Sequence, residues 1–195
     1  MPRGLPVRSI HQLWPPLCSL GCATLSTMSD LVPCPGCGAR FPAGSGATHR
    51  YIESSPGCWA VYGEVLAREY GDPDLFDRVH RLTVDAYAAQ HPGQPSVQSI
   101  RSVALHLISL CLMIEQGATA KKTAVALKEA TREKTRYFWL PPPASLGAIT
   151  VADVRATTTT RAHEEIVRQW AEAVWLAWSP HHATVHSWLR KYPKT

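Results

Sequence analysis

The sequence predicts a mainly α protein: a helical bundle of about five to six helices with a small zinc-knuckle-like module near its N-terminus. Helix start signals, such as Ser55-Pro56 and Asp72-Pro73, precede segments whose apolar residues recur at helical spacing. Two cysteines in the turn Cys34-Pro-Gly-Cys37 predict the module. With 195 residues, 45% of them hydrophobic, and seven tryptophans, the chain is large enough for one core. We therefore expect a single helical domain over residues 28–195.

The cysteine turn predicts a tetrahedral zinc site, because two intervening residues bring both sulfurs to about 2.3 Å from one ion. Its proline fixes one φ angle, and the glycines permit a tight turn. The nearest further donors in the sequence are His49 and Cys58. We therefore expect Zn²⁺ to be held by Cys34, Cys37, His49 and Cys58 in a metal-binding module over residues 32–58. Reduced cysteines in a surface turn, or a redox-active pair, are the alternatives.

Caps and stops divide the rest of the chain into helices. Gly71, Pro92-Gly93 and Gly117 end the first three, and Ser96, Thr119 and Thr160 serve as N-caps. The expected helices span residues 56–70, 73–91, 97–116, 120–137, 161–178 and 180–189. The third is apolar nearly all round, so we expect it to be the most deeply buried helix. A short extended piece is expected at 149–154.

Five of the nine histidines are candidates for a second metal or polar site inside the bundle. His182 and His186 lie four residues apart on one helical face and are able to chelate one ion together. His80 and His91 share a stripe of the second helix but lie roughly 16 Å apart, so they cannot share an ion. His106 is expected to be a hydrogen-bonded core residue. A second site would combine His182 and His186 with one of His80, His91 or His106.

The first 27 residues differ from the rest, because they contain no acidic side chain and no clear periodicity. We expect residues 1–27 to be a disordered N-terminal extension. No uninterrupted apolar run reaches about 18 residues, so we expect no membrane-spanning segment. The cysteines lack a secretory disulfide pattern, which favours a reducing compartment and a cytoplasmic location.

The chain lacks a glycine-rich phosphate loop, a nucleophile elbow and a Rossmann fingerprint, so nucleotide enzymes and serine hydrolases are not favoured. The preferred hypothesis is a metal-stabilised binding or adaptor module in which a basic helix or an aromatic groove meets a partner, most simply another protein. The alternative is a metal-dependent hydrolase or transferase that uses the bundle histidines, so the sequence leaves enzymatic activity open. Nucleic-acid binding is a third option, suggested by zinc and a net charge of +5.

Several sequence strings resemble a family of uncharacterised bacterial proteins of unknown function. They are CPGCGA from Cys34, HRYIE from His49, SPGCW from Ser55 and VDAYAAQHPG from Val84, together with the helix that carries His106. The resemblance covers residues 32–116 and transfers no catalytic residue. At the level of fold, the bundle also resembles the DinB-like metal-dependent enzymes, whose histidine spacing is not recognisable here.

Overall fold

Helices dominate the protein, as the sequence predicts. A computed structural model describes residues 31–132 and 136–190. The expected N-terminal extension, residues 1–27, lies outside them. The elements in chain order are β1 (Leu31–Pro33), β2 (Arg40–Pro42), α1 (Pro56–Tyr70), α2 (Pro73–Gln90), α3 (Val97–Leu110), a π-helical turn (Cys111–Glu115), α4 (Ala120–Ala130), α5 (Val151–Ala156), α6 (Thr160–Ala177), a 3-10 turn (Ser179–His181) and α7 (His182–Leu189).

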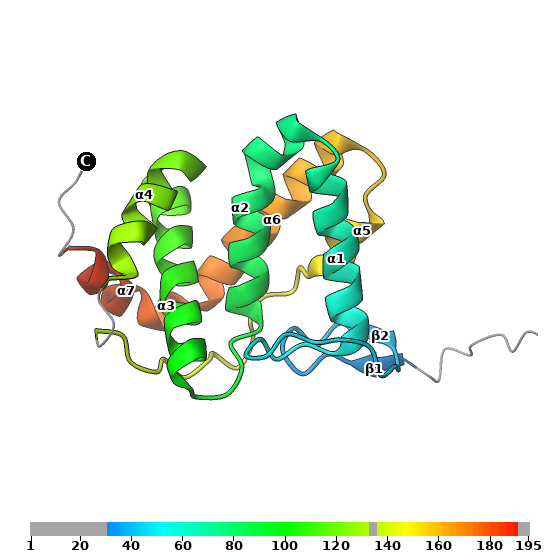
Figure 1. Ribbon diagram of the computed structural model, residues 1–195, viewed down its shortest axis with the longest axis horizontal. Coiled ribbons are helices and arrows are strands. Elements are labelled where there is room, and N and C mark those ends of the chain that lie inside the picture. Colours follow the sequence, from blue (N-terminus) through cyan, green and yellow to red (C-terminus); the bar gives the residue numbers. More distant parts are fainter. Residues whose placement is uncertain (1–30, 133–135, 191–195) are drawn as a thin grey trace, which may run out of the picture.

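Helix α2 is the centre of the bundle. It packs against α1, α3, α4 and α6, while α5 lies against α1 and α7 against α3. In Figure 1, α1, α2 and α3 stand side by side, and β1 and β2 form a small antiparallel hairpin beside the lower end of α1. Trp170 and Trp178 are fully buried in the core that these helices share. The first residue of α1 and the last residues of α2 therefore lie at the same end of the molecule as the hairpin.

The predicted starts of the first four helices are confirmed, and their caps explain them. The last helix, α7, begins at His182 rather than at residue 180, because a 3-10 turn precedes it. The side chains of Ser55, Asp72, Ser96 and Thr119 each accept a hydrogen bond from a backbone N–H in the first turn of the following helix. For α6 the N-cap is Thr159, one residue earlier than predicted. Local sequence therefore determines where these helices begin.

Two expectations from the sequence are wrong. Helix α4 ends at Ala130 rather than near Tyr137, because the Tyr137 hydroxyl and the Thr131 hydroxyl donate to backbone carbonyls of its last turn. Residues 149–154 are not an extended piece: residues 151–154 belong to the short helix α5, and Thr150 is its N-cap. The Thr150 side chain caps α5 and Asp153 bonds back to the backbone N–H of Thr150, a capping box that favours the helix.

Helix α3 and the π-helical turn form one continuous segment, Val97–Glu115. The segment has 19 residues, and an 18-residue window within it has a mean hydropathy of 1.6, so among the described residues this segment alone is long and apolar enough to cross a membrane, by length and composition only. Polar residues interrupt its apolar runs, as the sequence shows. Leu107, Ile108 and Leu110 are fully buried in the core, so α3 is a core helix of this bundle.

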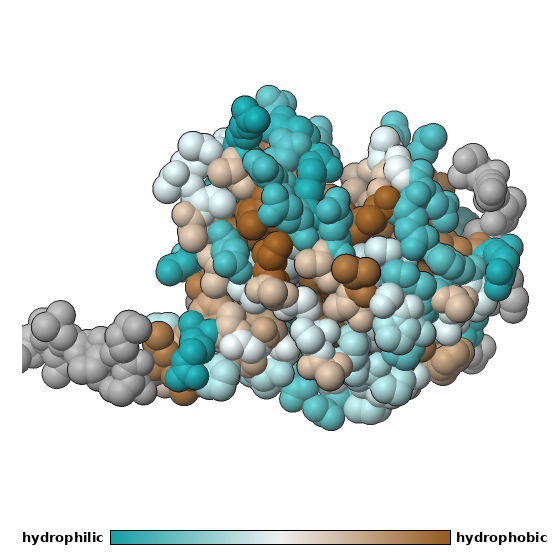
Figure 2. All heavy atoms as spheres, turned by 180° about the vertical axis from the view of Figure 1, so that it is seen from behind, coloured by the Kyte–Doolittle hydropathy of each residue, from teal (hydrophilic) through white to brown (hydrophobic). Residues whose placement is uncertain are grey.

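The surface mixes hydrophilic and hydrophobic residues. On the face shown in Figure 2, hydrophobic residues gather in small groups between hydrophilic ones. Exposed large side chains such as Tyr70, Leu176 and Phe138 come from different elements. Scattered apolar exposure of this kind is normal for folded proteins.

The last turn of α2 carries a buried polar side chain, Gln90, as its position in an apolar arc suggests. Its amide nitrogen donates to the carbonyls of Leu146 (3.1 Å) and Ile149 (2.9 Å). Its amide oxygen accepts from the indole N–H of Trp170 at 3.1 Å. Gln90 therefore fastens the loop between α4 and α5 onto the core.

Replacing Gln90 with leucine should destabilise the fold. The Gln90→Leu variant leaves two carbonyls and one indole N–H without their partner, which should cost about 2–4 kcal/mol of unfolding free energy. Urea denaturation of this variant and of the exposed-site control Gln169→Leu would measure the difference. The control should change stability by less than about 0.5 kcal/mol; equal stability of the two variants would show that the Gln90 bonds contribute nothing.

Candidate metal centre

The β1–β2 hairpin positions the first two cysteines. The Cys34 N–H donates to the Ala39 carbonyl (2.8 Å), and the Gly38 N–H donates to the Cys34 carbonyl (2.9 Å). Gly38 has a φ of 75°, a conformation that other residues rarely adopt. The turn presents the sulfurs of Cys34 and Cys37 to the same side, toward the start of α1.

Cys58 lies in the first turn of α1, where its backbone N–H donates a hydrogen bond to the Ser55 hydroxyl oxygen at 3.2 Å. The N–H of Ser55 itself donates to the Cys34 sulfur at 3.4 Å. Phe41 of β2 is buried against Gly57, where an added Cβ would lie 2.6 Å from the Phe41 Cβ. The hairpin therefore docks closely on the start of α1.

Three thiols and one imidazole meet at this point. The Cys37 and Cys58 sulfurs are 3.9 Å apart, and the Cys58 sulfur is 3.4 Å from His91 Nε2. The donor atoms of Cys34, Cys37, Cys58 and His91 all lie within 4.8 Å of one another. Cys34, Cys58 and His91 are buried and Cys37 is partly buried. This Cys₃His cluster has the composition and closeness to hold a metal ion.

His91 is held in the tautomer that metal binding requires. Its Nδ1 lies 2.7 Å from the Tyr87 carbonyl, which can only accept, so Nδ1 carries the proton. The Nε2 lone pair then points to the thiols. The Tyr87 hydroxyl also donates to the Cys58 sulfur at 3.5 Å. Such outer contacts orient metal ligands and stabilise thiolates.

Hydrogen bonds among the three neighbouring thiols give them different pKa values. Hydrogen bonds from Cys37 and Cys58 hold the pKa of Cys34 far below its ordinary value. The hydrogen bond with Cys34 raises the pKa of Cys37 to about 11 and likewise raises the pKa of Cys58. A negative charge on Cys34 thus disfavours ionisation of Cys37 and Cys58. A divalent cation among the sulfurs would favour ionisation of all three.

His49, predicted as the fourth ligand, lies outside the cluster, and His91 takes its place. The His49 ring packs against Tyr51 and Trp59, with centroids 4.4 Å and 5.3 Å away. Its Nδ1 is buried and has no hydrogen-bond partner among residues 31–132 and 136–190, and burial lowers the pKa of His49. Proximity in sequence suggested His49, but the fold returns the end of α2 to the start of α1 and thereby delivers His91.

The remaining candidate histidines do not gather at one point. His80, His106 and His186 each bond to a carboxylate, and His182 bonds to the Trp175 carbonyl. His80 Nδ1 lies 2.7 Å from Glu69, a fully buried residue that also contacts His163 Nε2 at 3.0 Å. Burial would raise the pKa of Glu69, but its hydrogen bonds with His163 and His80 outweigh that effect and lower it. His163 was not a candidate, although its place on the apolar stripe of α6, seven residues before Trp170, is a signal that it is buried.

His106 is bonded too, but it is not enclosed in the core. Its side chain is 19% exposed, and its Nδ1 lies 2.8 Å from the buried carboxylate of Asp85. Arg81 pairs with the same carboxylate, and Ser109 donates to it. His182 and His186 both face Glu115, which lies four residues after Cys111. Cys111, Glu115 and His186 form a second group of closely spaced donors.

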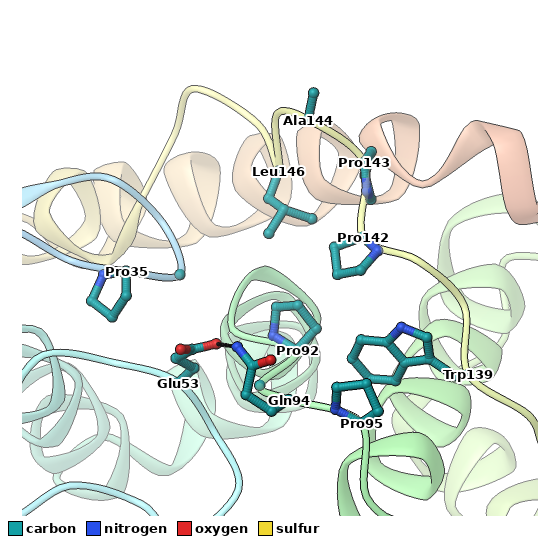
Figure 3. Close-up of a pocket in the computed structure, with 12 residues that line it drawn as sticks. Pro35, Glu53, Pro92, Gln94, Pro95, Trp139, Pro142, Pro143, Ala144 and Leu146 are labelled. Atoms are coloured by element: carbon teal, nitrogen blue, oxygen red, sulfur yellow. Dashed lines mark hydrogen bonds between the residues drawn. The ribbon is translucent and has the colours of Figure 1, made fainter.

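A pocket of about 470 Å³ lies beside the Cys₃His cluster (Figure 3). One wall comes from the segments that carry metal ligands: Pro35 and Gly36 in the cysteine turn, and residues 92–95 after His91. The opposite wall comes from the loop between α4 and α5, where Trp139 lies beside Pro95. Glu53 accepts a hydrogen bond from Gln94 at 2.9 Å within the pocket. The cluster and the Gln90 bonds thus hold opposite walls.

Fold and site together define a helical protein with a buried Cys₃His cluster. Residues 32–179 match the profile of DUF5946, a family of unknown function, and the chain belongs to that family. The matched region includes all four residues of the cluster and agrees with the resemblance drawn from the sequence. No curated protein and no solved structure matches the chain.

Replacing His91 and His49 with alanine, one at a time, should identify the fourth ligand. We expect His91→Ala to weaken zinc binding more than about 100-fold, since loss of a ligand should exceed the effect of losing an outer contact. We expect His49→Ala to retain zinc. Competition with a chromophoric chelator would measure both affinities. Equal retention by the two variants, or loss only in His49→Ala, would contradict the assignment.

Gly36 should be intolerant of a side chain. A Cβ there would lie 2.3 Å from His91 Cδ2 and 2.7 Å from the Glu53 carbonyl oxygen, so the turn or the imidazole must move. We expect Gly36→Ala to cost about 2 kcal/mol of unfolding free energy and to speed the loss of metal to a chelator. Gly44→Ala is the matched control, because its Cβ would have open space. Equal behaviour of the two variants would show that the close packing over His91 is unimportant.

Proposed function

We propose that this protein is a zinc-stabilised helical binding module. In this proposal Cys34, Cys37, Cys58 and His91 hold a structural Zn²⁺, and the pocket beside the cluster receives part of a partner protein. The cluster joins the predicted N-terminal module, residues 32–58, to the end of α2. This connection supports a single domain over residues 28–195.

The observation that carries the proposal is the complete and buried donor set. Structural zinc sites use four protein ligands, whereas catalytic sites use three and leave a position for water or substrate. Here four protein donors converge, and three of them are buried. An ion held by all four would have no position left for a substrate. Its effect would be mechanical: it would fix the cysteine turn against α1 and α2.

The donor types favour zinc. Three sulfurs and one imidazole nitrogen suit tetrahedral Zn²⁺, while Mg²⁺ and Ca²⁺ prefer oxygen ligands. The cysteines in the described residues are free thiols: Cys34, Cys37, Cys58 and Cys111. Reduced thiols of this kind support the proposal of a reducing, cytoplasmic location.

The pocket has the chemistry of a peptide-binding groove. Its walls present the rings of Trp139 and several prolines, which offer rigid apolar surface at little entropic cost. Glu53 adds one carboxylate at the side of the metal-bound wall. We propose that the pocket binds a short, extended segment of a partner that carries an apolar side chain next to a basic one.

Selection from a phage library of random short peptides, using the zinc-loaded full chain, would test this function. Enriched peptides should contain an apolar residue near Lys or Arg. Their affinity, measured by fluorescence anisotropy, should fall about 30-fold or more in Trp139→Ala, since a tryptophan hot spot is worth about 2 kcal/mol.

Phe138→Ala provides the matched control, because Phe138 is the exposed neighbour of Trp139 but does not line the pocket. This variant should keep the wild-type affinity. Failure to enrich any peptide, or equal effects of the two substitutions, would contradict a binding role for the pocket.

A further inference from the structure

We propose that Cys111, Glu115 and His186 form a second metal site, a Zn²⁺ site with an open coordination position. The Glu115 Oε2 lies 3.5 Å from the Cys111 sulfur and 2.7 Å from His186 Nε2. One donor atom from each residue falls within 4.8 Å of the others. The three donors come from the π-helical turn after α3 and from α7, and none belongs to the Cys₃His cluster.

Two of these donors, Cys111 and Glu115, lie four residues apart within the π-helical turn, a spacing that places side chains on one helical face. The chain leaves α3 at Leu110 and runs through Cys111–Glu115 with wider turns. The carboxylate of Glu115 lies over the sulfur of Cys111, which is itself fully buried. Single π-helical turns cost hydrogen-bond geometry and occur often at functional sites.

Surrounding residues orient the carboxylate. The Trp175 indole N–H donates to Glu115 Oε1 at 3.1 Å, and the ring of His182 stacks on Trp175 with centroids 3.8 Å apart. His182 Nε2 lies 2.9 Å from the Trp175 carbonyl, so Nε2 carries the proton. In the neutral ring, the Nδ1 lone pair then faces Glu115 Oε1 at 3.8 Å. This approach of a lone pair to a carboxylate is repulsive by itself, and a cation bound nearby would make it favourable.

The donor set differs in kind from the Cys₃His cluster. One thiolate, one carboxylate and one imidazole make three protein ligands, the number found where zinc keeps a fourth position for water. The side chains of Glu115 and His186 are 34% and 40% exposed, so the position opens to solvent. We therefore infer that metal at this site exchanges readily and is able to bind a small oxygen or nitrogen ligand.

Cobalt titration of the full chain, preloaded with one equivalent of zinc in the Cys₃His cluster, tests this inference. We expect a second equivalent of metal to bind, to show a thiolate-to-cobalt charge-transfer band, and to be removed by dilute chelator while the first zinc stays. Glu115→Gln and His186→Ala should each abolish the second equivalent, and Cys111→Ser should abolish the band.

His181→Ala is the matched control, because His181 precedes α7 but bonds to the Pro141 carbonyl instead of Glu115. It should leave the second equivalent intact. If no second equivalent binds, or if it persists in Glu115→Gln and His186→Ala, the group is only an ion pair. Metal in the Cys₃His cluster is counted separately in these experiments, so either site can fail without the other.

Discussion

The convergence of three thiols and one imidazole is the contact on which the N-terminal side of this protein depends. A hairpin with strands of three residues cannot be stable by itself. It is held by the buried Phe41 and by the approach of Cys34 and Cys37 to Cys58 and His91. Since Cys58 lies in the first turn of α1 and His91 directly follows α2, the cluster also links these two helices at one end.

The last turn of α2 connects this cluster to the rest of the molecule. Gln90 holds the loop that carries one wall of the pocket, and its neighbour His91 holds the other wall through the cluster. The shape of the pocket is thus set by two adjacent residues that bond in different directions. The group of Cys111, Glu115 and His186, which follows the C-terminal end of α3, differs from the Cys₃His cluster because Glu115 and His186 reach solvent. In the proposed roles, the enclosed Cys₃His cluster holds a structural metal ion, and the solvent-exposed group holds an ion that exchanges.

The sequence predicted what depends on local chemistry. Helix starts follow from Ser55, Asp72 and their prolines, and the thiol pair follows from the spacing of Cys34 and Cys37. The end of α4 was mispredicted because it depends on a hydrogen bond from Tyr137, which lies seven residues beyond the last residue of the helix. The sequence assigned His91 to a possible second site and not to the cysteines, because His91 lies 33 residues beyond Cys58. The sequence signal for this approach is the short turn between α1 and α2, which places the start of α1 and the end of α2 at the same end of the molecule.

Correlation of ligand protons with a bound, NMR-active cadmium ion tests the central claim most directly. Cadmium replaces zinc at thiolate sites and shows scalar coupling to the protons of the residues that bind it. The full chain, loaded with one equivalent, should show correlations to the β-protons of Cys34, Cys37 and Cys58 and to the ring protons of His91. A correlation to His49, or the absence of any one of the three cysteines, would contradict the account.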